Sequence, residues 1–370
     1  MIYNNFADIK LSALGMGCMR FPTKENNSQI DMEKTREMIA YAMKEGINYY
    51  DTAWGYHDGN SELAMGEILS EYPRDSFYLA TKFPGYDLDN MDKVEEIFEK
   101  QLEKCRVEYF DFYLFHCLSE NNIDAYLDPK FGIYDYLIKQ KELGRIHHLG
   151  FSVHCSHETM KRFLDAYGKD IEFCQIQLNW FDWDYQDAKT KVEIAKSYGI
   201  PVWVMEPVRG GSLARLDDFY MRKLENLRPS VTPAEWCFRF VQSIPEVTLT
   251  LSGMSDFDQL KENIATYSEA KPLTETEMNT LFGIGKAMAS KKVLPCTACS
   301  YCTTYCPMEL EIPHIIELYN ESIYSDAEIE TLPENKMPSN CIGCKACEAV
   351  CPQNIKISEM MTDFAEKILK

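Results

Sequence analysis

Eight of the fourteen cysteines lie in two short stretches near the C-terminus, and the two stretches share one spacing. CTACSYCTTYCP (296–307) and CIGCKACEAVCP (341–352) both read Cys-x2-Cys-x2-Cys-x3-Cys-Pro. In this pattern three thiolates of one loop take three corners of a [4Fe–4S] cubane, and the fourth cysteine ligates the neighbouring cluster. We therefore expect two [4Fe–4S] clusters. The ligands of one are Cys296, Cys299, Cys302 and Cys351, and those of the other are Cys341, Cys344, Cys347 and Cys306.

Zinc is the alternative occupant of paired Cys-x2-Cys units. A zinc ribbon needs four thiolates in all, however, and leaves the third and fourth cysteine of each stretch without a role. Disulfides are disfavoured in a cell interior. The segments 309–332 and 358–369 have a helical pattern, so the tail resembles two-cluster ferredoxin domains of the α-helical type. Two clusters close together favour an electron relay, and a structural or oxygen-sensing role for the clusters is the alternative.

A second group of reactive side chains lies far upstream, at the ends of expected strands. Asp51 and Tyr56 lie in DTAWGY, Lys82 ends LATK, and His116 ends DFYLFH. A tyrosine phenol has an ordinary pKa of about 10, and a nearby lysine ammonium lowers that pKa because it stabilises the phenolate. An aspartate holds the lysine in place, and a histidine orients a substrate oxygen by a hydrogen bond. These residue types fit protonation of the alkoxide that forms when a carbonyl is reduced.

Short apolar strands alternate with amphipathic helices over residues 10–290 and must bring these side chains together. The expected strands lie at 11–18, 47–51, 76–82, 111–116, 146–152, 173–179, 201–206 and 247–253, with helical patterns such as 32–46, 92–106 and 187–199 between them. Eight such units predict a (β/α)8 barrel, whose functional residues lie at the carboxyl ends of the strands. An open doubly wound sheet is the competing fold. It is disfavoured because GMGCMR (15–20) lacks the third glycine and no helical pattern follows directly.

The sequence DTAWGY with the following SE, then Lys82 and His116, makes the barrel resemble the aldo/keto reductase family over nearly its whole length. The resemblance implies that Tyr56 is the general acid–base and that Lys82, Asp51 and His116 support it. It also implies a small carbonyl or alcohol substrate, and NADP(H) or NAD(H) bound across the barrel mouth.

The same resemblance assigns nucleotide contacts to later strands and loops. Ser152 and Gln175 match the residues that hold the nicotinamide carboxamide, and Met205 replaces the aromatic residue that stacks on the ring. The loop EPVRGGSL contributes Pro207 together with Arg209, Gly210 and Gly211, which would take the pyrophosphate; on the adenosine side the contacts are Gly253, Met254, Gln259 and Asn263. The cation usual for a 2′-phosphate is missing, so the choice between NADP and NAD stays open.

Composition and the change of pattern near residue 291 define the remaining expectations. We expect two domains, a barrel over 1–290 and a cluster domain over 291–370. A formal net charge of -20 disfavours nucleic-acid binding. The N-terminus lacks the pattern of a signal peptide, and no apolar run reaches the length of a membrane span, so we expect no membrane partner and a cytoplasmic location.

Together these features predict an oxidoreductase in which the barrel and the clusters exchange electrons. Nicotinamide donates electrons in pairs, whereas clusters pass them singly, and a flavin is the usual device that splits the pair. FMN in the barrel, or a flavin in a redox protein partner, is therefore an alternative or additional cofactor. A reductase with structural or oxygen-sensing clusters, a flavin-dependent electron-transfer protein and a non-enzymatic redox or nucleotide sensor are the competing functions. The substrate and the direction of the reaction stay open.

Overall fold

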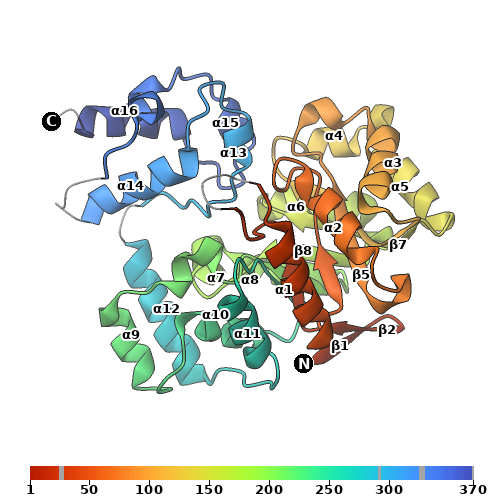
Figure 1. The fold of residues 1–370 in the computed structure, drawn as a ribbon, viewed down its shortest axis with the longest axis horizontal. Coiled ribbons are helices and arrows are strands. Elements are labelled where there is room, and N and C mark those ends of the chain that lie inside the picture. Colours follow the sequence, from red (N-terminus) through yellow and green to blue (C-terminus); the bar gives the residue numbers. More distant parts are fainter. Residues whose placement is uncertain (25–28, 291–292, 325–329, 369–370) are drawn as a thin grey trace.

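The structure is a computed structural model that describes residues 1–24, 29–290, 293–324 and 330–368 (Figure 1). Its centre is a closed barrel of eight parallel strands that are hydrogen-bonded in chain order, with the last strand paired to the first. The strands are β3 (Leu14–Gly17), β4 (Tyr49–Asp51), β5 (Tyr78–Phe83), β6 (Phe110–Leu118), β7 (Ile146–Val153), β8 (Phe173–Gln177), β9 (Val202–Met205) and β10 (Val247–Ser252). The predicted barrel is confirmed at all eight expected strands, and the open sheet is excluded.

A hairpin that the sequence patterns did not predict closes the amino end of the barrel. It consists of β1 (Tyr3–Phe6) and β2 (Ile9–Ser12), which pair antiparallel. The Phe6 ring lies 5.7 Å from the ring of Phe112 and 4.9 Å from that of Trp203, both near the beginnings of their strands. This aromatic plug seals one end, so ligands enter the barrel from the other.

The helices outside the barrel begin and end where local chemistry requires. In α1 (Met32–Lys44) the Asp31 side chain accepts a hydrogen bond from the Lys34 backbone N–H, and the chain turns away at Gly46, whose φ is 95°. Gly199, with φ of 70°, does the same after α8 (Ala188–Ser197), and α3 (Val94–Cys105) is also present as expected. The other barrel helices are α2 (Asn60–Leu69), α4 (Ile123–Leu127), α5 (Ile133–Glu142), α6 (His157–Tyr167), α7 (Asp182–Tyr185), α9 (Asp218–Glu225), α10 (Pro233–Gln242), α11 (Phe257–Thr266) and α12 (Glu275–Ala289).

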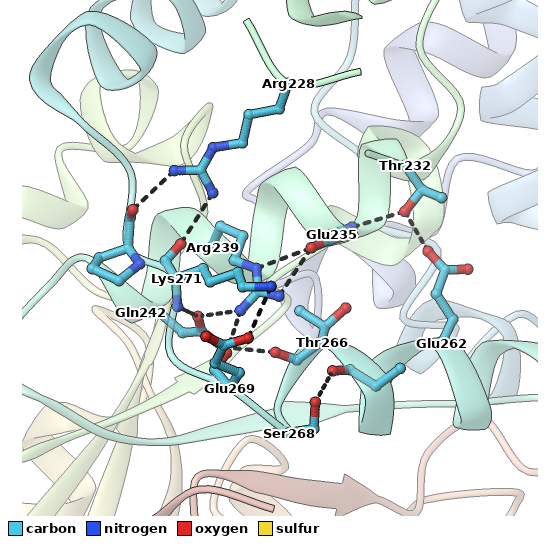
Figure 2. A network of polar contacts seen from close by, with 12 residues as sticks. Arg228, Thr232, Glu235, Arg239, Gln242, Glu262, Thr266, Ser268, Glu269 and Lys271 are labelled. Carbon is cyan, nitrogen blue, oxygen red and sulfur yellow. Dashed lines mark hydrogen bonds and ion pairs between the residues drawn. The ribbon is translucent and has the colours of Figure 1, made fainter. Parts of the chain in front are cut away.

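A polar network fixes α10, which lines the barrel mouth through Pro233, Ala234 and Phe238. Figure 2 shows Arg239 at its centre, donating to Glu235 at 2.9 Å and to the Glu269 carbonyl oxygen at 2.5 Å. Because the Arg239 side chain is almost fully buried, each of its hydrogen bonds to a carboxylate or carbonyl oxygen offsets desolvation of its charge. The helix that borders the mouth is therefore held rigidly.

The tail forms a smaller helical lobe beside the barrel, drawn in blue in Figure 1. Its helices are α13 (Tyr301–Thr304), α14 (Ile312–Tyr324), α15 (Ala346–Ala349) and α16 (Ile357–Ile368), and a separate apolar core includes Ile315, Met361 and Phe364. Helices are thus present over 312–324 and 357–368, as predicted. The expected domain boundary at 291 and residues 325–329 of the first predicted helical segment lie outside the described residues. Among the described helices, none has the length and apolarity needed to cross a membrane.

We predict that Gly66→Ala destabilises the barrel whereas Gly283→Ala stabilises it slightly. Both glycines lie inside helices, but a Cβ at position 66 would lie 2.1 Å from the Lys104 carbonyl oxygen, and a Cβ at 283 would meet open space. Overpacking against backbone costs about 1–3 kcal/mol, and Gly→Ala in an exposed helix contributes about 0.5–1 kcal/mol. Thermal unfolding of the cluster-loaded variants measures both effects. Equal melting temperatures would contradict the close α2–α3 approach.

Candidate active site and cluster cavities

The barrel brings all four predicted catalytic residues to one mouth. Asp51 ends β4, Lys82 lies near the end of β5, His116 lies near the end of β6, and Tyr56 lies in the loop between β4 and α2. All four are buried, and the most exposed of them, Tyr56, retains 8% of its accessible surface. Parallel strands of a closed barrel present their carboxyl ends on one side, which is why positions so far apart in sequence converge.

Lys82 is the hub of this group. Its Nζ donates to Asp51 Oδ1 at 2.6 Å, to the Thr52 carbonyl oxygen at 2.8 Å and to Tyr56 Oη at 3.3 Å. Three acceptors match the three protons of an ammonium, so each N–H of Lys82 has a hydrogen-bond acceptor and the side chain is held in one orientation. The Tyr56 and His116 rings lie edge to face, with centroids 6.2 Å apart.

The electrostatics of the mouth separate the protonation states of these side chains. Burial lowers the pKa of Lys82, but the Asp51 carboxylate more than offsets this, so the net pKa is raised and the ammonium is charged. Burial raises the pKa of Tyr56, and the Lys82 charge opposes that rise. Burial, followed by the nearby Lys82 charge, holds the pKa of His116 well below its ordinary value, so its imidazole is neutral at pH 7. A protonated phenol beside a charged lysine suits a proton donor.

Ser61 and Glu62, the SE of the matched motif, lie behind the mouth. Ser61 donates to the Cys18 carbonyl oxygen at 2.8 Å. Glu62 accepts from Thr81 Oγ1 and from Lys104 Nζ, each at 2.7 Å, and has no exposed surface. These bonds attach α2 to β5 and α3, so the two residues support the strands that carry Asp51 and Lys82.

A cavity of about 560 Å³ opens at the mouth and includes all four residues in its wall. Its size is in the range usual for small-molecule and cofactor sites. Most of the predicted nucleotide contacts also line it, namely Ser152, Gln175, Met205, Pro207, Gly210, Gly211, Gly253, Gln259 and Asn263. The structure thus brings these residues together around one space.

Ser152 and Gln175 fit the carboxamide role expected of them. Ser152 Oγ accepts a hydrogen bond from the Cys117 backbone N–H at 2.7 Å, which leaves its own proton free to donate. Gln175 Oε1 is buried and has no hydrogen-bond partner among the described residues. A buried acceptor of this kind is costly unless a ligand supplies a donor. One donor and one acceptor side by side match an amide group.

Arg209 and Met254 lie outside the cavity wall. Arg209 Nε donates to buried Asp182 at 3.1 Å, and its guanidinium lies 4.8 Å from the centroid of the Phe181 ring. Met254 is buried in the barrel core. The nucleotide contacts expected of these two stay predictions. Besides Lys82, two arginines line the cavity, Arg20 and Arg215, and sequence analysis assigned neither a nucleotide contact because no motif marks them.

The cysteines of the tail surround two separate small cavities. Cys296, Cys299, Cys302 and Cys351 line one, which we call the proximal cavity. Cys306, Cys341, Cys344 and Cys347 line the other, the distal cavity. Each cavity takes three cysteines from one cassette and one from the other, as the spacing predicts. All fourteen cysteines of the chain are free thiols, so the residues present fit two cubane clusters, each with four thiolate ligands.

The first cassette lies directly on the barrel mouth. Thr297, Cys299 and Tyr301 form part of the wall of the large cavity, and Cys299 lines both this cavity and the proximal one. Sequence analysis missed Tyr301 because it treated the two domains separately. The local signal available was an aromatic residue between two ligand cysteines, which does not reveal what the ring will face.

Several bonds attach the tail to the barrel around this contact. Arg20 donates to the Thr297 carbonyl oxygen at 2.9 Å, and Gln353 donates to Gln177 Oε1 at 2.9 Å. Tyr305 donates to Asp87 at 2.8 Å. These contacts come from the first cassette and from the residue after the second, and they reach the barrel after β3, at the end of β8 and after β5, so the proximal cavity has a defined position over the mouth.

Comparison with protein-family models matches both parts of the chain. Residues 13–286 match the aldo/keto reductase family, and residues 295–355 match a 4Fe-4S dicluster domain. Among curated relatives, the uncharacterized oxidoreductase YqkF of Bacillus subtilis is 25% identical over 306 residues, covering 74% of this chain and 93% of the relative. The NADH-specific methylglyoxal reductase of Escherichia coli is 24% identical over 302 residues, covering 70% and 90%.

Among solved structures, the holo form of the aldo-keto reductase AKR11C1 from Bacillus halodurans superposes with a TM-score of 0.63. It is 24% identical and covers 77% of this chain and 96% of its own. At this identity the likeness shows the fold, which is the barrel.

We predict that serine substitutions at the cysteines group by cavity and not by cassette. Cys351→Ser, in the second cassette, should abolish the same EPR signal of the reduced protein as Cys299→Ser in the first, because both line the proximal cavity. Cys306→Ser and Cys344→Ser should each remove the other EPR signal, because both residues line the distal cavity. Iron content should fall by about half in each case. Grouping by cassette would contradict the crossed ligand sets.

Proposed function

Because the chain belongs to the aldo/keto reductase family, we propose that it interconverts a small carbonyl compound and its alcohol, with Tyr56 as the general acid–base. The observation that carries this proposal is the buried contact of Lys82 Nζ with Asp51 Oδ1 at 2.6 Å and with Tyr56 Oη at 3.3 Å, in the wall of the cavity. It supports proton transfer to an oxygen bound in that cavity.

In the reducing direction, the Tyr56 O–H bond breaks and its proton passes to the substrate oxygen. The phenolate left behind is stabilised by the Lys82 ammonium, which Asp51 keeps charged and in place. Neutral His116 contributes a hydrogen bond and no charge. In the oxidising direction the same phenolate accepts the proton of the alcohol.

We propose a nicotinamide nucleotide as the cofactor, which when bound supplies or accepts a hydride at the substrate carbon. Ser152 and Gln175 would hold its carboxamide through one donor and one acceptor. The cavity continues from them past Gly211 and Gly253 to Gln259. Burial in this cavity excludes water from the reacting atoms.

We further propose that the two clusters exchange single electrons with the barrel site and with a redox protein. The residues support an ordered arrangement, because Cys299 lies between the proximal cavity and the barrel cavity, whereas Cys344 of the distal cavity is exposed. A hydride carries two electrons and a cluster accepts one, so this exchange requires a flavin, in the barrel or in the redox partner, that takes the pair and passes its electrons on singly. The fourteen free cysteines favour a reducing compartment, consistent with the cytoplasm.

Tyr56→Phe should lower kcat for carbonyl reduction by about 10²–10⁴-fold, because it removes the proton donor while keeping the ring. Tyr78→Phe is the matched control, since Tyr78 begins the strand that carries Lys82 and lies far from its carboxyl end. Steady-state rates with a panel of aldehydes and ketones, with NADPH and NADH in turn, measure the effect. Full activity in Tyr56→Phe would remove Tyr56 from the chemistry.

Electron exchange is tested by anaerobic reduction of the intact protein. NADPH or NADH, with substrate present, should bleach the visible absorbance of the clusters and produce EPR signals of reduced [4Fe–4S] centres. Added FMN serves as a second arm, and reduction that requires FMN would show that a flavin splits the electron pair. Clusters that no nucleotide reduces in either arm would favour a structural or oxygen-sensing role.

A further inference from the structure

A tyrosine of the tail reaches into the catalytic group of the barrel. The Tyr301 hydroxyl lies 3.1 Å from His116 Nε2, and the His116 ring lies edge to face with the rings of both Tyr301 and Tyr56. Tyr56, His116 and Tyr301 all line the same cavity. The tail hydroxyl therefore lies next to the two barrel side chains that would otherwise hold a substrate oxygen together.

We propose that Tyr301 is a further catalytic residue, whose hydroxyl donates the second hydrogen bond to the substrate oxygen while Tyr56 gives the proton. His116 then acts through Tyr301 and becomes a positioning residue. This inference rests on the proposed carbonyl–alcohol chemistry. It makes the barrel site incomplete without the cluster domain.

The Tyr301 ring is held firmly enough for such a role. It stacks on Tyr86 with centroids 5.2 Å apart and an interplanar angle of 12°. Its chain neighbours in the cassette, Cys299 and Cys302, both belong to the proximal set. The preceding backbone is fixed by the Arg20 bond to Thr297, so the ring cannot leave the mouth unless the cassette moves with it.

The hydrogen-bond directions follow from the neutral state of His116. A neutral imidazole carries one N–H, and His116 Nδ1 is buried with no partner among the described residues. Because a buried N–H without an acceptor is rarer than a buried acceptor without a donor, we assign the proton to Nε2, with the Tyr301 oxygen accepting it. The Tyr301 O–H then remains free to donate into the cavity. His116, Tyr301 and the substrate oxygen form one chain, and Lys82, Tyr56 and the same oxygen form another.

Two donors aimed at one oxygen have a clear chemical use. During reduction the carbonyl oxygen gains negative charge before its protonation is complete. A fixed donor in a water-excluded site stabilises that charge, and the loss of one such donor typically lowers kcat about 10²–10³-fold. Tyr301 is placed to act as this donor because its hydroxyl lies beside His116 in the wall of the cavity that Tyr56 also lines.

The test compares Tyr301→Phe with Tyr305→Phe in the full-length, cluster-loaded chain. Both substitutions delete one hydroxyl from a tyrosine that precedes a cluster cysteine and contacts the barrel, but the Tyr305 hydroxyl bonds Asp87 away from the catalytic group. We expect Tyr301→Phe to lower kcat for carbonyl reduction about 10²-fold, with iron content and EPR signals unchanged. Tyr305→Phe should keep the rate of the unaltered chain.

Two further variants separate catalysis from packing. Replacement of Tyr301 by p-aminophenylalanine retains the ring and an N–H donor, and it should recover part of the lost kcat even if the phenylalanine variant binds its clusters poorly. In the double variant Tyr301→Phe/His116→Asn, kcat should fall little below that of Tyr301→Phe, because His116 acts through the missing hydroxyl.

The results that would overturn the role of Tyr301 differ from the result that would overturn the proposed function. An unchanged kcat in Tyr301→Phe, or losses that multiply in the double variant, would overturn the role of Tyr301. A higher kcat/KM in Tyr301→Phe would also overturn it, because the hydroxyl would then be competing with the substrate. If the unaltered chain reduces no carbonyl compound with either nucleotide, the proposed function itself fails.

Discussion

The buried pair of Lys82 and Asp51 is the interaction on which the geometry of the barrel mouth depends. Their side chains retain 1% and 3% of their exposure, so the ammonium and the carboxylate have exchanged water for each other. Removal of one partner from a buried pair costs about 3–5 kcal/mol, because the remaining charge has no substitute for its hydration. The barrel can carry this pair because β4 and β5 are neighbours, with Asp51 in register with Ala80, two residues before the lysine. Tyr56 then receives a fixed positive charge.

The tail contact depends on a similarly specific constraint at Gly210. This glycine has φ of 65°, in the left-handed region, and a Cβ there would lie 2.1 Å from the Thr297 carbonyl oxygen. The loop after β9 is thus shaped to receive the backbone of the first cassette. Arg20 contributes to the same contact, since it bonds Thr297 at 2.9 Å and Glu206 at 3.5 Å. A glycine that sequence resemblance assigns to a pyrophosphate therefore has a structural reason of its own.

Most of the fold could be predicted from local sequence patterns. The apolar strands and the helix-ending glycines depend on neighbours a few residues away, and these predictions are confirmed. The cassette spacing is equally local, and the ligand assignment drawn from it stays a prediction. The two cavities sort the cysteines as the spacing predicts, which is the geometry that two crossed ligand sets need. Asp51, Lys82 and His116 were identifiable because the carboxyl ends of barrel strands converge whatever the loops do.

Features that depend on contacts distant in sequence were not predictable in this way. Phe6 lies in a short hairpin, and its side chain is buried only because the closed barrel brings residues such as Trp203 against it. Arg209 forms an ion pair with Asp182 at the start of α7, and no sequence pattern around either residue predicts this pair. Tyr301 depends on how two separately recognisable domains dock, which neither domain's sequence records by itself.

The contact between the cluster domain and the barrel places the proximal cavity next to the cavity of the barrel mouth. Direct hydride transfer between a nicotinamide and a carbonyl needs no one-electron carrier, so clusters beside the mouth have to serve either the supply of electrons or the shape of the site. The first cassette contributes directly to the shape of the site, because Thr297, Cys299 and Tyr301 form part of the cavity wall. Cys299 faces the barrel cavity from the proximal set, and Tyr301, two residues later, meets His116 at 3.1 Å. A movement of this short loop would therefore also change the contact between Tyr301 and His116, and occupancy of the cavity would in turn be linked to the state of the proximal cluster.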